Sequence, residues 1–547
     1  MPAQIRMRRA AALLIVLVGL ALRLHNIGFG LPSLYDPDEP IFMVIAAKLL
    51  SARTLNPGWF GHPGTTTIYL IALIDAGVYG VGVALGHYSS VAQFVHAAYA
   101  DPGLLFLPAR VAMALMGGCC VALTYFIGRR AWGTGAGLIA ALLLAFNALH
   151  IAWSQVIRTD VHASLFMLAA VLFAMRFADG RRFRDCIISS LLVGFAIATK
   201  WPAITALAAV LGAIAYLVHE GAAGRWMAAK WATASIAVTL AGLFIASPFI
   251  FLDYPTVLSN LSGEARPFHL GHTGGGFGSN LVSYVQHEMI GSMGWIGFAF
   301  AIVGVGAIIT RRGAARFVIF PPALAFLAVI CGQKLVWSRW LIPELPFLCL
   351  FAAIGIAWAA ERMSGRWPLL REPLLIGLLG GVAFLPTAAG ALGEARERGH
   401  DTRRMAADWI VRHAAPGSTI ALEHLELRLR DQPYRFLFPM GSAGCLDGKD
   451  LLRSGVHYDE LDRLRHGSSI VDLGSVSPRR ADTCRADYVI LSYYDSYLKE
   501  RARFPRELAT YAAILSGGHT VALFRPEPGR IGGPIVRIVA VPRNQSR

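Results

Sequence analysis

The chain has 547 residues, of which 55% are hydrophobic and only 15% charged, and its mean hydropathy is +0.52. Soluble domains carry about 25% charged residues, so this composition excludes an ordinary soluble protein and indicates a polytopic membrane protein. The formal net charge of +16 would suggest a nucleic-acid partner in a soluble protein. Here many Lys and Arg residues lie in short loops between apolar segments, so we expect no nucleic acid and interpret the charge as a topology signal.

The first apolar run covers residues 8–27. A signal peptide begins in the same way, but no small-residue cleavage site follows and further apolar segments come after, so we interpret it as an uncleaved membrane helix. An acidic cluster, Tyr35-Asp36-Pro37-Asp38-Glu39-Pro40, comes next. Carboxylates beside hydrocarbon are costly to ionise, so this cluster indicates proton abstraction, metal binding or recognition of a cation. Pro40 restarts the chain into 41–53, an amphipathic stretch expected to lie on the membrane.

The later apolar segments predict a helical membrane bundle of about 11–13 spans, several of them shorter than the ~20 residues that a bilayer needs. After the first, segments of spanning character run over 104–128, 133–150, 159–178, 186–199, 201–219, 231–252, 291–310, 316–332, 339–360 and 373–392. The pair 186–199 and 201–219 meets at Thr199-Lys200-Trp201-Pro202. Pro202 is expected to break the helix there, and Lys200 must find water or a partner.

The distribution of basic loops predicts the orientation. These loops, at 129–130, 176–184, 225–230, 311–316 and 362–371, fall on the side of the N-terminal arginines provided that the apolar segment 65–86 does not cross. The positive-inside rule therefore predicts that 65–86 lies along or dips into the outer interface. Eleven spans then place the loops 28–103, 151–158, 253–290 and 333–338, together with Lys200 and the region 393–547, on the outer side.

The chain becomes charged near residue 393, which predicts two domains: a membrane domain over 1–392 and an outer α/β domain over 393–547. An amphipathic helix is predicted at 402–414, and strand-like runs lie at 418–422 and 487–492. This region has two cysteines, Cys445 and Cys484, for which a disulfide and two free thiols fit equally well. The seven cysteines of the chain show no metal-ligand spacing, so we expect no zinc site.

On this topology the unusual polar side chains gather on the outer side. They are Asp36, Asp38, Glu39, His62, Arg158, Asp160, Lys200, His269, His272, Lys334 and Arg339. For any single Lys or Arg, snorkelling to water is the simpler interpretation. The whole set indicates a site that binds an anion and moves a proton. Such a site suits group transfer from a phosphate-linked donor, because a base deprotonates the acceptor hydroxyl while cations neutralise the departing phosphate.

Six runs of sequence carry a family resemblance: YDPDEPIFMVIAAKLL, GHPGTTTIYL, FNALHIAWSQVIRTDVHASLF, GFAIATKWPAI, the GHTGGG loop and SRWLIPELPFLCLFAAIG. In this order, over residues 1 to about 360, they resemble the landmarks of the GT-C glycosyltransferases. The branch they resemble is the bacterial one related to protein O-mannosyltransferases and lipid A aminoarabinose transferases. The region after 393 resembles the outer domains of these enzymes only in its position.

The resemblance implies a multi-pass inner-membrane enzyme with its C-terminal domain outside, which transfers a sugar with inversion from a polyprenyl-phosphate donor to a lipid, glycan or protein acceptor. It implies that Asp38 is the general base with Glu39 beside it, and that Asp160 positions the acceptor or a cation. Asp36 is an extra carboxylate without an assigned role. We expect no cofactor besides the lipid-linked donor, and a divalent metal held by Asp38, Glu39 and Asp160 is left open.

Lys200 and Arg339 are predicted to hold the donor phosphate, with Arg158 and Lys334 as weaker candidates, whereas Arg110 is expected to snorkel. The Lys-Pro pair of the aminoarabinose branch corresponds to His62-Pro63 in this chain. A titratable group thus replaces a permanent cation, and this difference argues against aminoarabinose as the substrate.

The glycine-rich stretch around His272 lacks the strand and helix context of a nucleotide loop. It predicts a mobile outer loop that closes over substrate, with a plain connector as the alternative.

The main alternative function is a lipid or sugar transporter, or a flippase. Transporters tend to have internal repeats and charges at the bilayer midplane. Here the acidic motif is not repeated and the charges lie at one face. A membrane receptor with an outer sensing domain would not need carboxylates and cations assembled from five separate loops.

Overall fold

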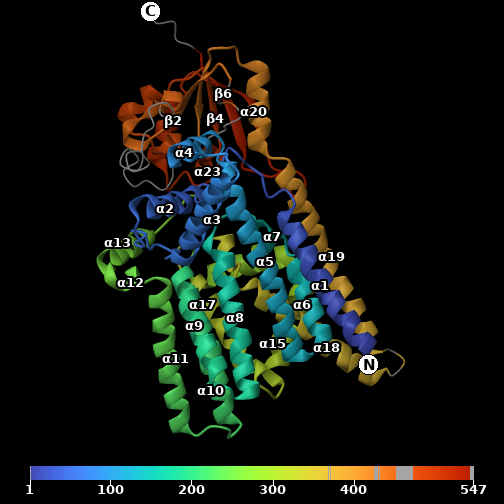
Figure 1. Ribbon diagram of the computed structural model, residues 1–547. Helices are drawn as coiled ribbons and strands as arrows, with labels where there is room; N and C mark the ends of the chain where they lie inside the picture. Colours follow the sequence, from blue (N-terminus) through green and yellow to red (C-terminus); the bar gives the residue numbers. More distant parts are fainter. Residues whose placement is uncertain are drawn as a thin grey trace, which may run out of the picture. The chain divides into compact units, whose positions relative to one another are not determined.

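The computed structural model describes residues 2–367, 369, 371–423, 429, 432–450 and 472–542. The chain is mostly helical and divides into two compact units (Figure 1). The membrane unit comprises Met1–Ile27 and Asp38–Leu392, and the C-terminal unit comprises Gly28–Pro37 and Gly393–Arg547. The boundary within the acidic cluster separates Asp36, which belongs to the C-terminal unit, from Asp38, which belongs to the membrane unit.

The membrane unit consists of helices joined by short loops. The helices are α1 (Pro2–Leu24), α2 (Glu39–Ala52), α3 (Thr65–Ala84), α4 (Val91–Ala100), α5 (Gly103–Trp132), α6 (Thr134–Ala145), α7 (Ala148–Ser154), α8 (Thr159–Gly180), α9 (Phe183–Thr199), η1 (Trp201–Ala206), α10 (Leu207–His219), α11 (Arg225–Ala246), α12 (Phe249–Leu252), α13 (Tyr254–Glu264), α14 (Phe277–Ser283), η2 (Tyr284–Met289), α15 (Ile290–Thr310), α16 (Ala315–Val318), α17 (Phe320–Cys331), η3 (Ser338–Leu341), α18 (Leu345–Arg366) and α19 (Glu372–Gly399), which continues past Leu392. Helices α8, α9, α10 and α11 pack side by side (Figure 1).

Within the described residues, eight helices are long and apolar enough to cross a membrane, or nine if the bent pair α6 and α7 counts as one span. The predicted class, a multi-pass helical membrane protein, is confirmed, with fewer full-length spans than the 11–13 expected. Three expected spans are missing from this set: α9 has only 17 residues, the segment 316–332 is divided into α16 and α17, and α1, although 23 residues long, contains four arginines. Helix α3 has the length and hydropathy of a spanning helix, so its predicted place at the outer interface stays a prediction.

Close packing in the membrane unit relies on small residues. Helices α15 and α18 cross where Gly304 and Gly355 face each other's backbone. A Cβ on Gly304 would overlap the carbonyl oxygen of Phe351, and a Cβ on Gly355 would overlap that of Phe300. Glycine at such crossings lets two apolar helices approach closely, which is how membrane helices gain van der Waals contact.

The predicted break at Lys200 is confirmed. Helix α9 ends at Thr199, Lys200 is extended, and Pro202 lies in the first turn of η1, where its missing N–H costs nothing. Pro63 forms an antiparallel bridge with Lys200, flanked by bonds from the Trp201 N–H to the His62 carbonyl (3.0 Å) and from the Gly64 N–H to the Thr199 carbonyl (3.1 Å). The break therefore fixes the loop after α2 against the end of α9.

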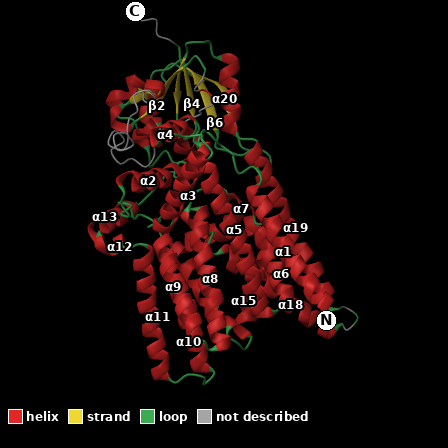
Figure 2. Cartoon of the chain, viewed as in Figure 1, coloured by secondary structure: helices red, strands yellow, loops and turns green. Residues whose placement is uncertain are grey.

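The C-terminal unit contains a six-stranded mixed sheet in the order β3-β2-β1-β4-β6-β5 (Figure 2). Its elements are α20 (Thr402–His413), β1 (Thr419–Leu422), β2 (Arg435–Pro439), β3 (Cys445–Asp447), β4 (Tyr488–Leu491), α23 (Tyr494–Lys499), α24 (Pro505–Ile514), β5 (His519–Phe524) and β6 (Val536–Ala540). Strand β1 pairs in parallel with β2 and β4, and the other pairs are antiparallel. The predicted helix at 402–414 and the strands at 418–422 and 487–492 are confirmed.

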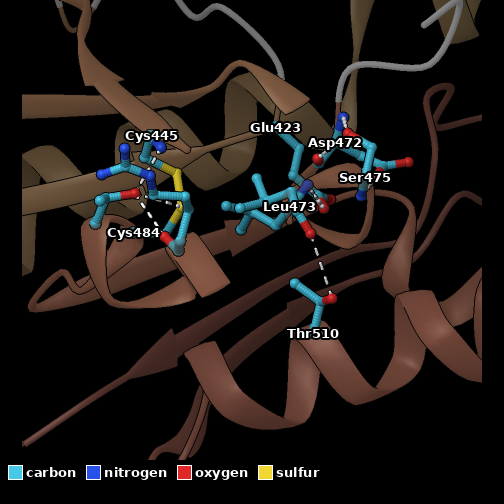
Figure 3. The surroundings of a disulfide bond; sticks show 10 residues. Glu423, Cys445, Asp472, Leu473, Ser475, Cys484 and Thr510 are labelled. Atoms are coloured by element: carbon cyan, nitrogen blue, oxygen red, sulfur yellow. Dashed lines mark hydrogen bonds between the residues drawn. A yellow bond between two sulfur atoms is a disulfide. The ribbon is translucent and has the colours of Figure 1, made fainter. Parts of the chain in front are cut away.

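Cys445 and Cys484 form a disulfide, with their Cα atoms 5.0 Å apart (Figure 3). Of the two alternatives that the sequence left open, the structure has the bonded one. The same unit buries two carboxyl groups, Glu423 at the end of β1 and Asp472 (Figure 3). Glu423 accepts hydrogen bonds from the N–H groups of Ser492 (2.6 Å) and Tyr493 (2.9 Å), and the Tyr497 hydroxyl donates to Asp472 at 2.7 Å.

Candidate active site

Asp38 stands directly before α2, whose first turn contains Glu39 and Pro40. Its carboxylate forms an ion pair with Arg158, the residue before α8, and its Oδ2 lies 3.7 Å from Nη2 of Arg339 in η3. Burial raises the pKa of Asp38, but the charges of Arg158 and Arg339 outweigh burial and lower it to about 2. Three separate segments of the chain therefore meet at one ionised carboxylate.

A second buried ion pair lies close to the first. Asp160, in the first turn of α8, pairs with the Lys200 ammonium at the break after α9. Both side chains are at most 8% exposed. Arg158 and Asp160 are two residues apart, so the start of α8 brings both pairs together. The structure thus joins five of the predicted residues, namely Asp38, Arg158, Asp160, Lys200 and Arg339.

Glu39 is engaged in a different contact. Its Oε2 lies 2.6 Å from Nη2 of Arg110 and its Oε1 lies 2.8 Å from Nε of Arg110, and both side chains are fully buried. Oε1 also accepts the N–H of Ile157 at 2.9 Å, and Nη1 of Arg110 donates to the Ile27 carbonyl at 3.0 Å. The expectation that Arg110 snorkels to water is wrong, because its guanidinium turns into the bundle and forms a bidentate pair with Glu39.

His62 lies beside these pairs, with its ring centre 5.1 Å from that of Trp59 and 6.2 Å from that of Phe42. Among the described residues, its Nδ1 has no hydrogen-bond partner. Burial, together with the positive charges of Lys200 and Arg339, lowers the pKa of His62 well below its usual value. The sequence treated His62 as a titratable cation, but in this environment the ring is neutral near pH 7.

The stretch around His272 is paired with the chain before η3. Thr273 bridges Leu335, the Gly274 N–H donates to the Lys334 carbonyl at 2.8 Å, and the Val336 N–H donates to the His272 carbonyl at 2.8 Å. The His272 ring stacks on Trp337 at 3.5 Å between centres. The structure thus has a two-stranded contact here that ends next to Arg339, while the predicted closure of this loop over substrate stays a prediction.

Trp337 joins this contact to the ion pairs, because the guanidinium carbon of Arg339 lies 4.1 Å from its ring centre. The His269 ring also contacts Trp337, at 4.9 Å between centres. Lys334 is different: its side chain is exposed, and among the described residues no ion pair joins it to Asp38 or Asp160. Lys334 is therefore separate from the paired carboxylates, and its predicted contact with the donor phosphate stays a prediction.

Sequence reasoning missed two further contributors. Trp337 contacts the Arg339 guanidinium, but an aromatic side chain in the loop 333–338 gives no sign of that contact in the sequence. Glu264 ends α13, and a Cβ on Gly61 would lie 2.9 Å from its Oε1. Burial raises the pKa of Glu264, and the charge of Asp38 adds to the shift. No spacing in the sequence links Glu264 with the acidic cluster, because the two are joined only by the folding of α13 against the loop before α3.

The carboxylates do not fit a metal site. Asp38, Glu39 and Asp160 are each paired with a cationic side chain, whereas a divalent metal needs several oxygen ligands. Among the described residues, no group of three or more His, Cys, Asp and Glu side chains could hold an ion.

Residues 103–251 match the family model described as dolichyl-phosphate-mannose-protein mannosyltransferase. The matched segment contains Arg110, Arg158, Asp160 and Lys200, while Asp38 and Arg339 lie outside it. No curated protein matches the chain in sequence.

Three solved structures of two proteins share the fold over nearly the whole chain. ArnT from Cupriavidus metallidurans in the apo state is 15% identical, with 98% of each chain covered and a TM-score of 0.50. The apo oligosaccharyltransferase of Archaeoglobus fulgidus is 13% identical, with 94% of this chain and 73% of that chain covered and a TM-score of 0.52. The same archaeal enzyme tethered to an acceptor peptide is 12% identical, with 98% and 75% covered and a TM-score of 0.50. This multi-pass membrane protein therefore shares the fold of these glycosyltransferase structures, and its residues 103–251 are similar to the mannosyltransferase family model.

Proposed function

We propose that the protein transfers a sugar from a polyprenyl-phosphate donor to an acceptor nucleophile at the outer face of the inner membrane, with inversion at the sugar carbon. The observation that carries this proposal is the contact of Asp38 with Arg158 and Arg339, next to the pair of Asp160 and Lys200. Three cations lie beside these two carboxylates, and guanidinium and ammonium groups form strong hydrogen bonds with phosphate oxygens, which suits a lipid-linked phosphate donor.

The roles follow from this geometry. Asp38 takes the proton of the acceptor, whose freed electron pair forms the new bond to the sugar carbon as the bond from that carbon to the phosphate oxygen breaks. Lys200 and Arg339, with Arg158 beside them, neutralise the charge that develops on the departing polyprenyl phosphate. A single displacement of this kind inverts the configuration. Asp160 orients Lys200, and Glu39 positions the loop rather than reacting, because its oxygens are bound to Arg110 and Ile157.

The family description names a polyprenyl-type phosphate sugar, and the archaeal structure holds an acceptor peptide, so a lipid-linked donor and a peptide, glycan or lipid acceptor are proposed in these general terms. The neutral His62, in place of a permanent cation, supports a donor other than aminoarabinose. The charge pattern of the loops supports an outer location for the site and for the residues after 393. Membrane domain 1–392 would then hold the catalytic groups, and 393–547 would form the periplasmic domain.

The test uses the purified full-length protein in lipid nanodiscs, with a radiolabelled polyprenyl-phosphate hexose and cell-envelope extract as the acceptor source. Asp38→Asn is expected to lower turnover at least about 100-fold while leaving donor binding intact, because a general base contributes about 10²–10⁴ in rate. Asp36→Asn is the matched control, since it removes a neighbouring carboxylate that belongs to the other unit.

Equal turnover by Asp38→Asn and wild type would refute Asp38 as the base. In sealed vesicles, labelled donor that crosses the bilayer without forming a product would instead identify a flippase, the alternative function.

A further inference from the structure

A basic groove lies at the ends of α5, α8 and α9 that are far from the active site. Near their other ends, these three helices carry Arg110, Asp160 and Lys200 respectively. The groove has a volume of about 790 Å³. Its charged lining consists of Arg129, Arg130, Arg176, Arg182, Asp179 and Asp185. Nothing in the proposed transfer reaction uses these residues.

The charges of the basic groove do not balance within the chain. Arg130 pairs with Asp179 at 2.7 Å, and Arg176 lies 3.5 Å from Asp185. For the other two arginines, Arg129 and Arg182, no acidic partner is found among the residues that the structure describes. Two guanidinium groups are therefore left to take an anion from outside, and guanidinium groups match the oxygens of a phosphate with paired hydrogen bonds.

The basic groove lies at a membrane boundary. Along α5 the rise from Arg110 to Arg129 is about 28 Å at 1.5 Å per residue, close to the ~30 Å of a bilayer's hydrocarbon core. The groove also has an apolar wall formed by Phe126 and Leu172, and Phe126 is 47% exposed. An occupant of this groove thus meets positive charge at one side and an exposed apolar surface at the other.

The positive-inside rule accounts for arginines at this end of the helices, but not for their arrangement around a hollow with an apolar wall. A free phosphate ion would use the arginines alone. We propose that the basic groove binds the phosphate headgroup of an anionic phospholipid from the leaflet opposite the active site, with the lipid's glycerol and upper chains against Phe126 and Leu172. Basic hollows between membrane helices are suited to such headgroups. This proposal does not depend on the transferase reaction.

The test measures lipid binding to the purified full-length protein by native mass spectrometry, with phosphatidylglycerol and phosphatidylcholine titrated separately. Wild type is expected to bind phosphatidylglycerol at least tenfold more tightly than phosphatidylcholine. The double variant Arg129→Gln, Arg182→Gln is expected to lose this preference. The matched control Arg225→Gln, Lys230→Gln removes the same charge from the start of α11, outside the groove, and should keep the preference.

Several results would overturn the proposal: equal binding of the two lipids by wild type, an equal loss in the control, or an unchanged preference in the groove variant. Displacement of phosphatidylglycerol by millimolar inorganic phosphate would also overturn it, since the groove would then recognise the free ion. The melting temperature and transferase activity of each variant report on folding. If the double variant does not fold, Arg129→Gln alone takes its place, with Arg225→Gln as its control and at least a threefold loss of preference expected.

Discussion

The buried pair of Glu39 and Arg110 offers the sharpest test of how the site is held in place. The pair is fully excluded from solvent and has two hydrogen bonds, at 2.6 and 2.8 Å. Replacing Arg110 with Met would leave the Glu39 carboxylate buried without its cation. Removing one partner of a buried ion pair costs about 3–5 kcal/mol, because the remaining charge stays desolvated. We therefore expect Arg110→Met to destabilise the membrane unit by this amount.

A second substitution separates the lost pair from lost packing. Glu39→Gln keeps an oxygen to accept the Ile157 N–H but removes the buried charge. In the double variant Glu39→Gln, Arg110→Met no charge is left unpaired, so most of the destabilisation should be recovered. The two positions thus form a double-mutant cycle. We expect a coupling free energy between them of about 2–3 kcal/mol, which lies within the range known for residues in contact.

The assays are thermal unfolding of the detergent-purified protein and turnover with saturating donor. Glu39 adjoins Asp38, and Ile157 adjoins Arg158, so the pair holds Asp38, the proposed base, in position against Arg158. A shift of about 1 Å there costs about 100-fold in turnover. Donor affinity should change less than threefold in Arg110→Met, because Lys200 and Arg339 belong to other segments. Wild-type melting and turnover in Arg110→Met, or a double variant no more stable than the single one, would refute this reasoning.

Two further predictions concern the proposed phosphate-binding cations and the C-terminal unit. Lys200→Ala and Arg339→Ala should each weaken donor binding by about 1.5–3 kcal/mol, because a hydrogen bond to a charged group contributes about that much. If equilibrium binding shows unchanged donor affinity in both variants, these residues do not bind the donor phosphate. Burial raises the pKa of Glu423 from 4.5 to about 7 and that of Asp472 from 3.8 to about 6. The folded unit thus holds more protons than the unfolded chain at intermediate pH. The contribution of these two groups to the free energy of unfolding should therefore be greatest below about pH 4 and decline as pH rises through 6 to 7. Hydrogen exchange of β1 and β4 in the full-length protein measures this decline, which Glu423→Gln should reduce; an increase in protection with pH would contradict it.

The sequence predicted features that depend on local chemistry. Pro202 lacks the N–H that a continuous helix would need, so the break beside Lys200 could be predicted from a single residue, although Pro108 and Pro386 lie inside the helices α5 and α19. The helix over Thr402–His413 and the strand over Thr419–Leu422 likewise followed from the period of their apolar residues. The acidic cluster was recognisable because carboxylates are rare beside a membrane helix.

The sequence did not predict which side chains pair. Arg110 lies in α5, a helix that is apolar on all sides, so no periodicity tells whether a given position faces lipid or the bundle. Snorkelling and burial therefore fit the same pattern until Glu39 is placed opposite. The contact of His272 and Gly274 with 334–336 was hidden for another reason, because backbone pairing between two distant loops requires no particular side chains.

The ion pairs also answer an objection to Asp38 as a base. A carboxyl group whose pKa is about 2 is a weak base toward a hydroxyl. The shift, however, is caused by Arg158 and Arg339, and a donor phosphate would compete for these same guanidinium groups. When the phosphate binds these guanidinium groups, their positive charges no longer outweigh the effect of burial on Asp38, and the pKa of Asp38 should rise. Base strength would then appear only with donor bound. The pH profile of kcat at saturating donor reports the donor-bound enzyme, and the pH profile of kcat/KM for donor reports the free enzyme. We therefore expect the acidic limb of the kcat profile to lie at higher pH than that of the kcat/KM profile. Acidic limbs at the same pH would show that the donor phosphate leaves Arg158 and Arg339 paired with Asp38.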